Sequence, residues 1–132
     1  MSDENIEIVR RIYDDYVDRP EAVRDLFAPD VVHDASDTAP DVGVVRGIDA
    51  FDESLRTYFE SFDAFQVEIE EVIHADERLV ILAVVDVGRL RGSTAEVRNH
   101  RFHVWTLSDG KAVRLSSHLE KGQAVKAAGL SE

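Results

Sequence analysis

The side chains best suited to chemistry lie on two segments that the sequence predicts as neighbouring strands. Residues 78–90 contain Asp86, and residues 95–107 contain Arg101 and His103. Because side chains alternate between the two faces of a strand, Arg101 and His103 share one face. A carboxylate, a guanidinium and an imidazole that converge in an apolar cavity would shift each other's proton affinities and could move protons on a bound molecule. We therefore expect Asp86 and His103 to form an acid–base pair.

Two further side chains on these strands could support such a reaction. Arg101 or Asn99 would stabilise an enolate-like oxygen as negative charge develops on it. The alternative interpretation is structural: Asp86 and Arg101 would form a cross-strand ion pair, worth at most about 1 kcal/mol if exposed. The sequence leaves both interpretations open.

Other residues are expected to line the same pocket. His33, on a strand predicted over residues 31–35, could donate a hydrogen bond or relay a proton, but it could equally be a half-buried histidine bonded to a backbone carbonyl. Tyr16 and Tyr13 lie on a predicted helix, and we assign a hydroxyl in the cavity to Tyr16 before Tyr13, although aromatic residues at this spacing more often belong to the core. The remaining expected lining residues are Phe59, Val84, Asn99, Trp105 and Ser117.

The sequence gives no indication of a metal ion or a cofactor. His100 and His103 are three residues apart on a predicted strand and project to opposite faces, so they cannot chelate one ion. The chain has no Cys, no glycine-rich phosphate loop and no dinucleotide-binding fingerprint. We therefore expect a cofactor-independent protein without a bound metal.

The composition restricts the classes of partner. The 132 residues include 27 Asp and Glu against 15 Lys and Arg, for a formal net charge of −12. This balance disfavours nucleic acid and anionic membrane surfaces, which bind through Lys and Arg. The longest apolar run, residues 79–85, is far shorter than the roughly 20 residues that span a bilayer. Since the first residues also lack the apolar core of a signal peptide, we expect a soluble, cytoplasmic protein.

The order of predicted elements indicates one α+β domain over residues 1–132. Apolar residues recur at helical spacing in residues 3–17 and 48–62, with a short helical stretch over residues 21–27 between them. Four extended segments joined by short turns follow, and they predict an antiparallel meander: 65–74, 78–90, 95–107 and 111–119. Residues 120–130 are predicted as a final helix. This order favours helices packed on one face of a sheet.

The first long strand also predicts a bent sheet. Apolar and polar residues alternate from Phe65 to Ile69, and the alternation breaks at Glu70 and Glu71. A β-bulge at this break would reset the two faces and bend the sheet. A bent sheet with helices across its concave side leaves a pocket at the open end, where the candidate residues would meet.

The stretches FAPDVVHDAS, VVRGIDAF, HVWTLSDGKAVRL and EKGQAVKAAGL, in this order of elements, resemble the SnoaL-like family of the NTF2-like, or ketosteroid isomerase-like, superfamily. The resemblance covers residues 5–130. It implies a cone-shaped α+β fold, with a curved mixed or antiparallel sheet and N-terminal helices on its concave face, around a pocket for a small apolar or polycyclic molecule. The superfamily includes isomerases, polyketide cyclases, epoxide hydrolases, dehydratases and noncatalytic domains, so the fold alone does not define a reaction.

Residue-by-residue matching shows which catalytic groups of the superfamily this chain lacks. The aspartate base of the isomerase branch falls at Ala35. The arginine and two aspartates of the limonene-epoxide-hydrolase branch fall at Val84, Asp86 and Ser117. Only Asp86 retains the expected chemistry, so the resemblance implies neither of these mechanisms and leaves Asp86 as a candidate acid or base.

The resemblance also implies dimerisation through the outer face of the sheet. His100, Phe102 and Val104 would place apolar bulk on that face, and a soluble monomer rarely exposes such a patch. We therefore expect a homodimer. The expected function is a pocket for a small, largely apolar organic molecule, with an acid–base step such as isomerisation, cyclisation, hydration or hydrolysis. The alternative is a noncatalytic ligand-binding or dimerisation domain.

Overall fold

The structure, a computed structural model, describes residues 2–130. Its elements in chain order are α1 (Ser2–Asp15), the 3-10 helix η1 (Pro20–Leu26), β1 (Phe27–Asp34), β2 (Val44–Arg46), α2 (Ile48–Phe59), β3 (Phe62–Ala75), β4 (Leu79–Leu90), β5 (Glu96–Ser108), β6 (Lys111–His118) and α3 (Lys121–Ala127). The predicted helices and long strands are all present. The largest difference at a boundary is in β1, which begins at Phe27, four residues before the predicted start; α2 ends three residues early because Phe62 already begins β3. No helix in residues 2–130 is long and apolar enough to cross a membrane.

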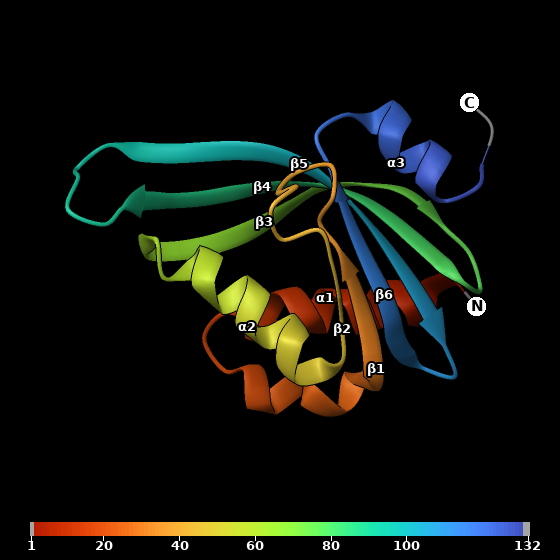
Figure 1. Ribbon diagram of the computed structural model, residues 1–132. Coiled ribbons are helices and arrows are strands. Elements are labelled where there is room, and N and C mark those ends of the chain that lie inside the picture. Colours follow the sequence, from red (N-terminus) through yellow and green to blue (C-terminus); the bar gives the residue numbers. More distant parts are fainter. Residues whose placement is uncertain (1, 131–132) are drawn as a thin grey trace.

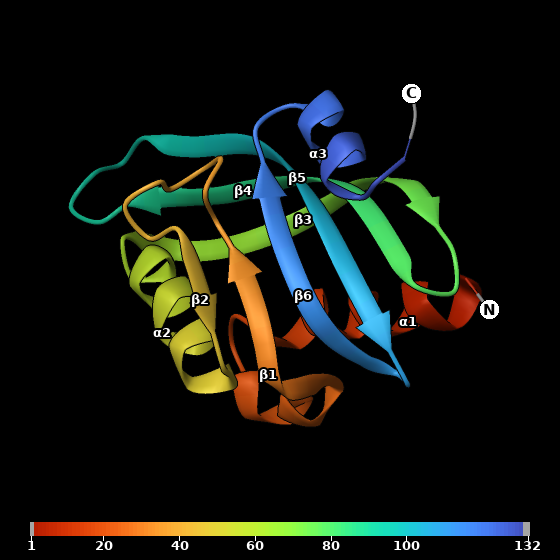
Figure 2. The same ribbon diagram turned by 45° about the vertical axis from the view of Figure 1, so that its right-hand side comes forward.

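The strands form one curved sheet in the order β2-β1-β6-β5-β4-β3 (Figures 1 and 2). β3 to β6 form the predicted antiparallel meander, and Asp109 and Gly110 make the tight β5–β6 turn with φ angles of 52° and 77°. β1 adds to β6 in parallel, with Asp34 opposite Ser116. The three-residue strand β2, which pairs with β1, was not predicted because it is too short to show alternation.

The bend of the sheet comes from irregular pairing between β3 and β4. The predicted bulge is confirmed, since the register shifts between Ile69 and Glu71. Two more shifts flank it, between Asp63 and Gln66 and between Val72 and His74. Three irregularities in one long strand pair give the sheet a strong curvature, which leaves room beneath its concave face.

The two faces of the sheet carry different helices. α1, η1 and α2 lie on the concave side and α3 on the convex side (Figures 1 and 2). The main core lies between the concave face and α1, η1 and α2; its largest fully buried side chains include Val9, Val23, Phe51, Leu82 and Val84. A smaller core lies under α3, where Ala124 and Ala128 pack on Ile81 and Val104.

The outer face of the sheet is not the apolar patch that we expected. Val104 is buried under α3, and Phe102 is half-buried in the same cluster. His100 is exposed and lies 3.1 Å from Glu70, and Arg98 forms an ion pair with Glu68 on the same side of the sheet. The chain's own C-terminal helix therefore covers the most apolar part of this face, which strand parity alone could not show.

Candidate functional site

A cavity of about 310 Å³ lies between the concave face of the sheet and the helices α1 and α2. Most of its wall is apolar, and polar groups reach it from β1, β4, β5 and β6, from α2 and from the loop that precedes β2. A volume of this size is at the lower end of the range usual for small-molecule sites, which also combine an apolar wall with few polar groups. The geometry is that of a pocket for a small organic molecule.

The structure brings most of the predicted site residues to this cavity. Those that line it are Asp86, Arg101, His103, Tyr16, His33, Phe59, Trp105 and Ser117. Two do not: Val84 is fully buried in the core, and Asn99 lies beside Asp86 in the β4–β5 pairing, outside the lining. Ala35, which the resemblance places at the position of a catalytic aspartate, also lines the cavity.

Asp86 and His103 lie in different parts of the cavity. In the register of β4 and β5, Asp86 is opposite Asn99 and His103 is opposite Leu82. This offset of four residues corresponds to about 13 Å along a strand. The expected direct pair is therefore absent, because a shared strand face does not imply a short distance along the strand.

Asp86 instead accepts a hydrogen bond from α2. The Tyr58 hydroxyl donates to its Oδ2 at 2.8 Å. Burial raises the pKa of Asp86, and the Tyr58 hydrogen bond and the charge of Arg101 only partly oppose this effect. Arg101 donates to the backbone carbonyl of His100 at 2.9 Å instead of forming the structural ion pair with Asp86. The sequence analysis missed Tyr58, because only the folded chain shows that α2 crosses β4 here.

Replacing Asp86 by asparagine is expected to stabilise the protein at pH 7. A carboxyl group whose pKa is raised on folding costs stability as the pH rises above its ordinary value, because the folded state binds the proton more tightly than the unfolded state. Asparagine removes this cost and can still accept the hydrogen bond from Tyr58. Urea unfolding of both proteins should show that the substitution increases the free energy of unfolding more at pH 7 than at pH 4. An equal or smaller increase at pH 7 would contradict a raised pKa for Asp86.

At the other end of the cavity, His103 is held by two aromatic side chains. The indole N–H of Trp105 donates to the Tyr13 hydroxyl at 2.9 Å, and this hydroxyl lies 2.5 Å from Nδ1 of His103. The rings of Tyr13 and His103 are nearly parallel, with centroids 6.0 Å apart. Burial, with smaller contributions from the charges of His33 and Arg101, lowers the pKa of His103 to about 3.

Tyr13 of α1 and Tyr16, which directly follows this helix, have exchanged the roles that we expected. Tyr13 brings its hydroxyl to the cavity histidine, whereas the Tyr16 hydroxyl donates to Asp52 of α2, which Arg24 also contacts at 3.1 Å. The ring of Tyr16 still lines the cavity. The assignment of the cavity hydroxyl to Tyr16 was wrong because the rotation of α1 about its axis is set by packing that periodicity does not fix.

His33 occupies a third polar position, on β1. Its Nδ1 lies 3.2 Å from the Ser54 hydroxyl, which itself donates to the backbone carbonyl of Phe51 at 2.8 Å. Burial lowers the pKa of His33 to about 4. Both cavity histidines are therefore neutral at pH 7. Within residues 2–130, no three His, Asp or Glu side chains converge in a way that could hold a metal ion.

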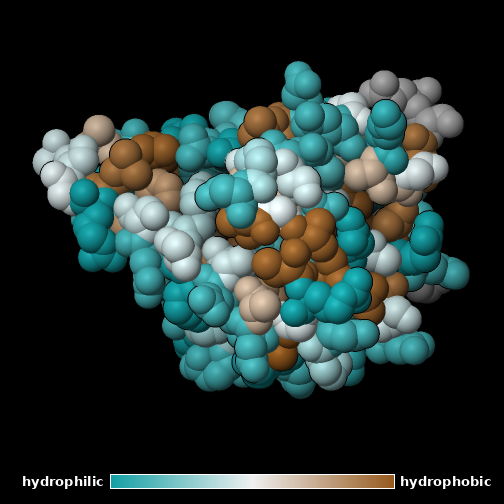
Figure 3. Space-filling model, in the orientation of Figure 1, coloured by the Kyte–Doolittle hydropathy of each residue, from teal (hydrophilic) through white to brown (hydrophobic). Residues whose placement is uncertain are grey.

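The loop of residues 35–43 forms part of the cavity rim. Thr38, Ala39, Asp41 and Val42 line the cavity, and Val42 is 39% exposed. In Figure 3, hydrophobic side chains gather near the middle of the face on which this loop lies, with hydrophilic ones around them. The rim is therefore partly apolar and accessible.

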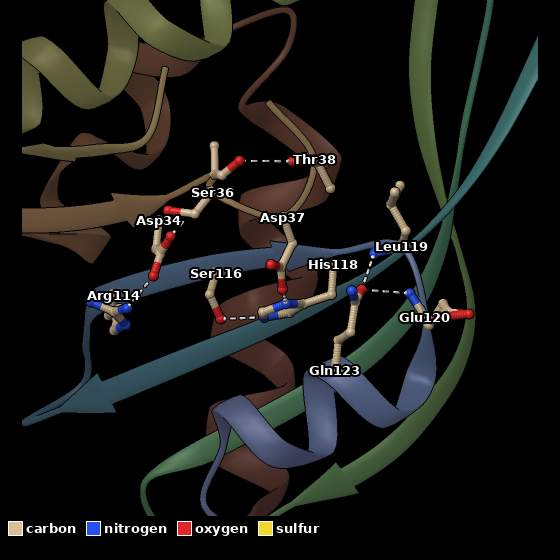
Figure 4. A network of polar contacts seen from close by, with 11 residues as sticks. Asp34, Ser36, Asp37, Thr38, Arg114, Ser116, His118, Leu119, Glu120 and Gln123 are labelled. Atoms are coloured by element: carbon tan, nitrogen blue, oxygen red, sulfur yellow. Dashed lines mark hydrogen bonds and ion pairs between the residues drawn. The ribbon is translucent and has the colours of Figure 1, made fainter. Parts of the chain in front are cut away.

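A polar network on the outer face of β6 holds this loop (Figure 4). Asp37 of the loop lies 2.6 Å from Nδ1 of His118, and Nε2 of His118 lies 2.9 Å from the Ser116 hydroxyl. Just before the loop, Asp34 forms an ion pair of 2.7 Å with Arg114. The side chains that fix the loop thus point away from the cavity that the loop borders.

The order Asp37–His118–Ser116 is that of a serine hydrolase triad, but its setting is structural. Ser116 is only 3% exposed, so a substrate carbonyl cannot reach its hydroxyl. Its strand is paired on both sides, with Asp34 on β1 and Val104 on β5, so the N–H groups that would stabilise an oxyanion belong to the sheet. We assign this cluster to holding the loop in place.

Replacing Asp37 by alanine is expected to destabilise the protein by about 1 to 3 kcal/mol, because the buried His118 loses a hydrogen-bond partner. Amide hydrogen exchange should accelerate at Ala39 and Gly43, whose N–H groups bond within the loop. Asp41→Ala, which removes an exposed carboxylate from the same loop, is the matched control. Equal exchange rates in the two variants would show that Asp37 does not hold the loop.

Comparison with known proteins identifies relatives of this architecture. A family model described as the SnoaL-like domain matches residues 9–115, which is most of the chain. A search of proteins with curated functions gives no match. The match agrees with the resemblance found in the sequence.

Solved structures show the same fold at low sequence identity. A protein from Jannaschia sp. CCS1, provisionally named a SnoaL-like polyketide cyclase, is 22% identical with a TM-score of 0.75, over 96% of this chain and 92% of that chain. TerC, co-crystallised with polyporic acid, is 21% identical with a TM-score of 0.73, over 93% and 96%. A protein with a ketosteroid isomerase-like fold from Catenulispora acidiphila, in complex with trimethylamine, is 15% identical with a TM-score of 0.71, over 95% and 94%. The expected NTF2-like architecture is confirmed.

Proposed function

Because the chain belongs to the SnoaL-like domain family, we propose that its cavity binds a small, largely apolar organic molecule and catalyses an acid–base step on it without a cofactor. The step would be an isomerisation, a cyclisation or a hydration, which need only proton transfer and charge stabilisation. The observation that carries this proposal is an apolar cavity of about 310 Å³ whose wall contains Asp86, Arg101 and His103.

The environment of these groups supports proton transfer. Asp86 has a raised pKa and His103 a lowered one, and burial is the main cause of both shifts. The shift of Asp86 moves its pKa toward neutral pH, as in many catalytic carboxyl groups, and the shift of His103 keeps its ring neutral at pH 7, so that it can donate or accept a hydrogen bond. Arg101, which also lines the cavity, could stabilise a developing negative charge.

Binding can be tested with the single tryptophan of the chain, because Trp105 lines the cavity. A panel of small apolar ketones, esters and phenols should change its fluorescence, and a molecule carried through purification should appear in native mass spectrometry. Turnover of the best ligand should then fall in Asp86→Asn and His103→Gln. Binding with no turnover of any ligand would favour the noncatalytic alternative, and no binding at all would refute the proposal.

We also propose that the protein is a homodimer in solution. The part of the outer sheet face that α3 leaves uncovered carries charged side chains, among them Glu68, Glu70 and Arg98. Arginine and glutamate at such positions can form ion pairs across an interface, and we expect such a dimer to weaken as salt is added. Light scattering at micromolar concentration should give twice the 14.8 kDa of one chain, and a monomer mass at low salt would refute this prediction.

A further inference from the structure

Three polar atoms at one end of the cavity have no hydrogen-bond partner within residues 2–130: Nε2 of His33, Nε2 of His103 and the hydroxyl of Ser117. No buried side-chain nitrogen or oxygen of the described residues lacks a partner, so these three atoms reach the open cavity. They come from β1, β5 and β6, which are adjacent in the order β1-β6-β5. A molecule in this part of the cavity would therefore meet all three.

The contacts of His103 favour one of its two neutral tautomers. An indole N–H can only donate, so the oxygen of Tyr13 is the acceptor in its contact with Trp105. The hydroxyl proton of Tyr13 is then available for Nδ1 of His103 at 2.5 Å. A neutral ring that accepts at Nδ1 carries its proton on Nε2, so His103 presents an N–H donor to the cavity.

The contacts of His33 give the opposite result. The Ser54 hydroxyl donates its only proton to the carbonyl oxygen of Phe51 at 2.8 Å. Its oxygen must then accept a proton from Nδ1 of His33 at 3.2 Å. Nε2 of His33 is consequently unprotonated and presents a lone pair to the cavity. One imidazole is thus held as a donor and the other as an acceptor.

The spacing of the two rings suits a ligand between them. His33 is opposite Leu115 of β6, and His103 is opposite Ser117 of the same strand. The two histidines are two strand spacings apart, about 10 Å, and two residues apart in register, about 7 Å, so their backbones are about 12 Å from each other and both side chains extend from the concave face. Ser117 lies between them and offers a hydroxyl that can donate or accept.

From this geometry we propose that His33 and His103 act on one bound molecule, an enolisable carbonyl compound, with His33 as the proton acceptor and His103 as the hydrogen-bond donor to the carbonyl oxygen. Tyr13 and Ser54 are positioning residues that hold the two rings in opposite tautomers. This inference rests on the proposed acid–base function and deepens it, because it names as the base His33, for which the sequence analysis left open a hydrogen bond, a proton relay or a structural role.

The reaction balances without a further reactant. The C–H bond next to the carbonyl group breaks and its proton moves to Nε2 of His33. The electron pair of that bond forms the C=C of an enolate, and the carbonyl π pair moves onto the oxygen that His103 stabilises. The negative enolate also favours the imidazolium form of His33 beside it. Return of a proton to the same carbon completes an exchange with solvent, and in a β,γ-unsaturated carbonyl compound its return to the γ carbon of the dienolate completes an isomerisation.

The tautomers can be measured without any ligand. Long-range 1H–15N correlation spectra of the uniformly labelled protein at pH 7 should show His103 protonated at Nε2 and His33 protonated at Nδ1. Tyr13→Phe should alter the ring shifts of His103 and leave those of His33 unchanged, and Ser54→Ala should do the reverse. Ser54→Thr, which keeps the hydroxyl, should restore the wild-type spectrum of His33. The same tautomer on both rings would overturn the inference and leave the proposed function untouched.

Catalysis can be followed with 2-tetralone, an apolar and enolisable ketone. Exchange of its α-protons for deuterium in D2O, observed by 1H NMR, should be accelerated by the protein. His33→Gln should reduce this acceleration at least about 100-fold, as expected for loss of a general base, while the affinity measured by Trp105 fluorescence changes little. His100→Gln replaces an exposed histidine on the outer face; it is the matched control and should retain the full rate.

The outcomes separate the two proposals. If 2-tetralone binds but its exchange is not accelerated, or if His33→Gln keeps the full rate, His33 is not the base. If neither 2-tetralone nor any other ketone or ester of the panel binds although the phenols do, the ligand class is wrong and the cavity proposal stands. If no member of the panel binds, both proposals fall.

Discussion

Lowering the pH from 7 to 5 is expected to reduce the free energy of unfolding by about 4 kcal/mol, with roughly half from each of His33 and His103. Burial lowers the pKa of these side chains to about 4 and about 3, from an ordinary value of 6.5. Unfolded chains bind protons below pH 6.5, whereas the folded protein does not until the pH approaches these lowered values. Stability is therefore lost as the pH falls below 6.5.

The other carboxyl groups with a shifted pKa either do not titrate between pH 7 and pH 5 or oppose the loss of stability in this range. The hydrogen bond with His74, followed by those of two backbone N–H groups, lowers the pKa of Asp76 to about 2, so its contribution is lost only below about pH 4. Asp86, with a raised pKa, gains stability as the pH falls and offsets a part of the loss.

Urea unfolding at several pH values between 7 and 5 measures directly how the free energy of unfolding changes with pH. His33→Gln should remove about half of the acid-induced loss, because glutamine keeps a neutral polar side chain that does not titrate. Phe51→Leu, which weakens packing without changing charge, should lower stability equally at both pH values. The same pH dependence of stability in His33→Gln and in the wild type would contradict the contribution assigned to His33.

Replacing Phe51 by alanine should cost about 3 to 5 kcal/mol of stability. Phe51 is fully buried, and its ring centroid lies 5.2 Å from that of Phe27, 5.5 Å from that of His33 and 6.2 Å from that of Tyr16. The substitution thus opens a void where α1, α2 and β1 meet. Since a domain is stable by only about 5 to 15 kcal/mol, the variant should be close to unfolding at room temperature.

The loss can be followed by far-ultraviolet circular dichroism and tryptophan fluorescence in urea. Leu90→Ala is the control, because this side chain is 48% exposed and should change stability by no more than about 0.5 kcal/mol. Equal midpoints for Phe51→Ala and Leu90→Ala would mean that Phe51 does not join the three elements. Retention of the wild-type midpoint by Phe51→Ala would mean the same.

The parts of the fold that depend on neighbouring residues could be predicted from the sequence. The spacing of apolar residues predicted α1 and α2. The Asp109–Gly110 turn predicted a hairpin, and the break in alternation at Glu70 and Glu71 predicted a bulge. Each of these features is determined within about ten residues of chain. The parallel pairing of β1 with β6 and the short strand β2 depend on distant partners and have no local signature.

The candidate site shows the same division between local and distant information. Strand parity placed Arg101 and His103 on the cavity face, but it could not show that Asp86 lies four register positions from His103. Helical spacing could not distinguish the hydroxyl of Tyr13 from that of Tyr16, since both rings pack in the main core, Tyr13 from α1 and Tyr16 from the turn that follows it. Register and helix rotation are set by packing of the whole domain.

The parallel pairing of β1 with β6 affects how the chain can reach its final shape. Asp34 pairs with Ser116, 82 positions further along the chain, so β1 cannot enter the sheet until the ribosome has released β6. Until then the apolar inner face of β1, with Val31 and Phe27, has no sheet to join. Closing so long a segment is slow, and nascent chains would remain open to chaperones until β6 has been synthesised. Assembly of the cavity is therefore a late event in folding, because its walls come from both halves of the sequence.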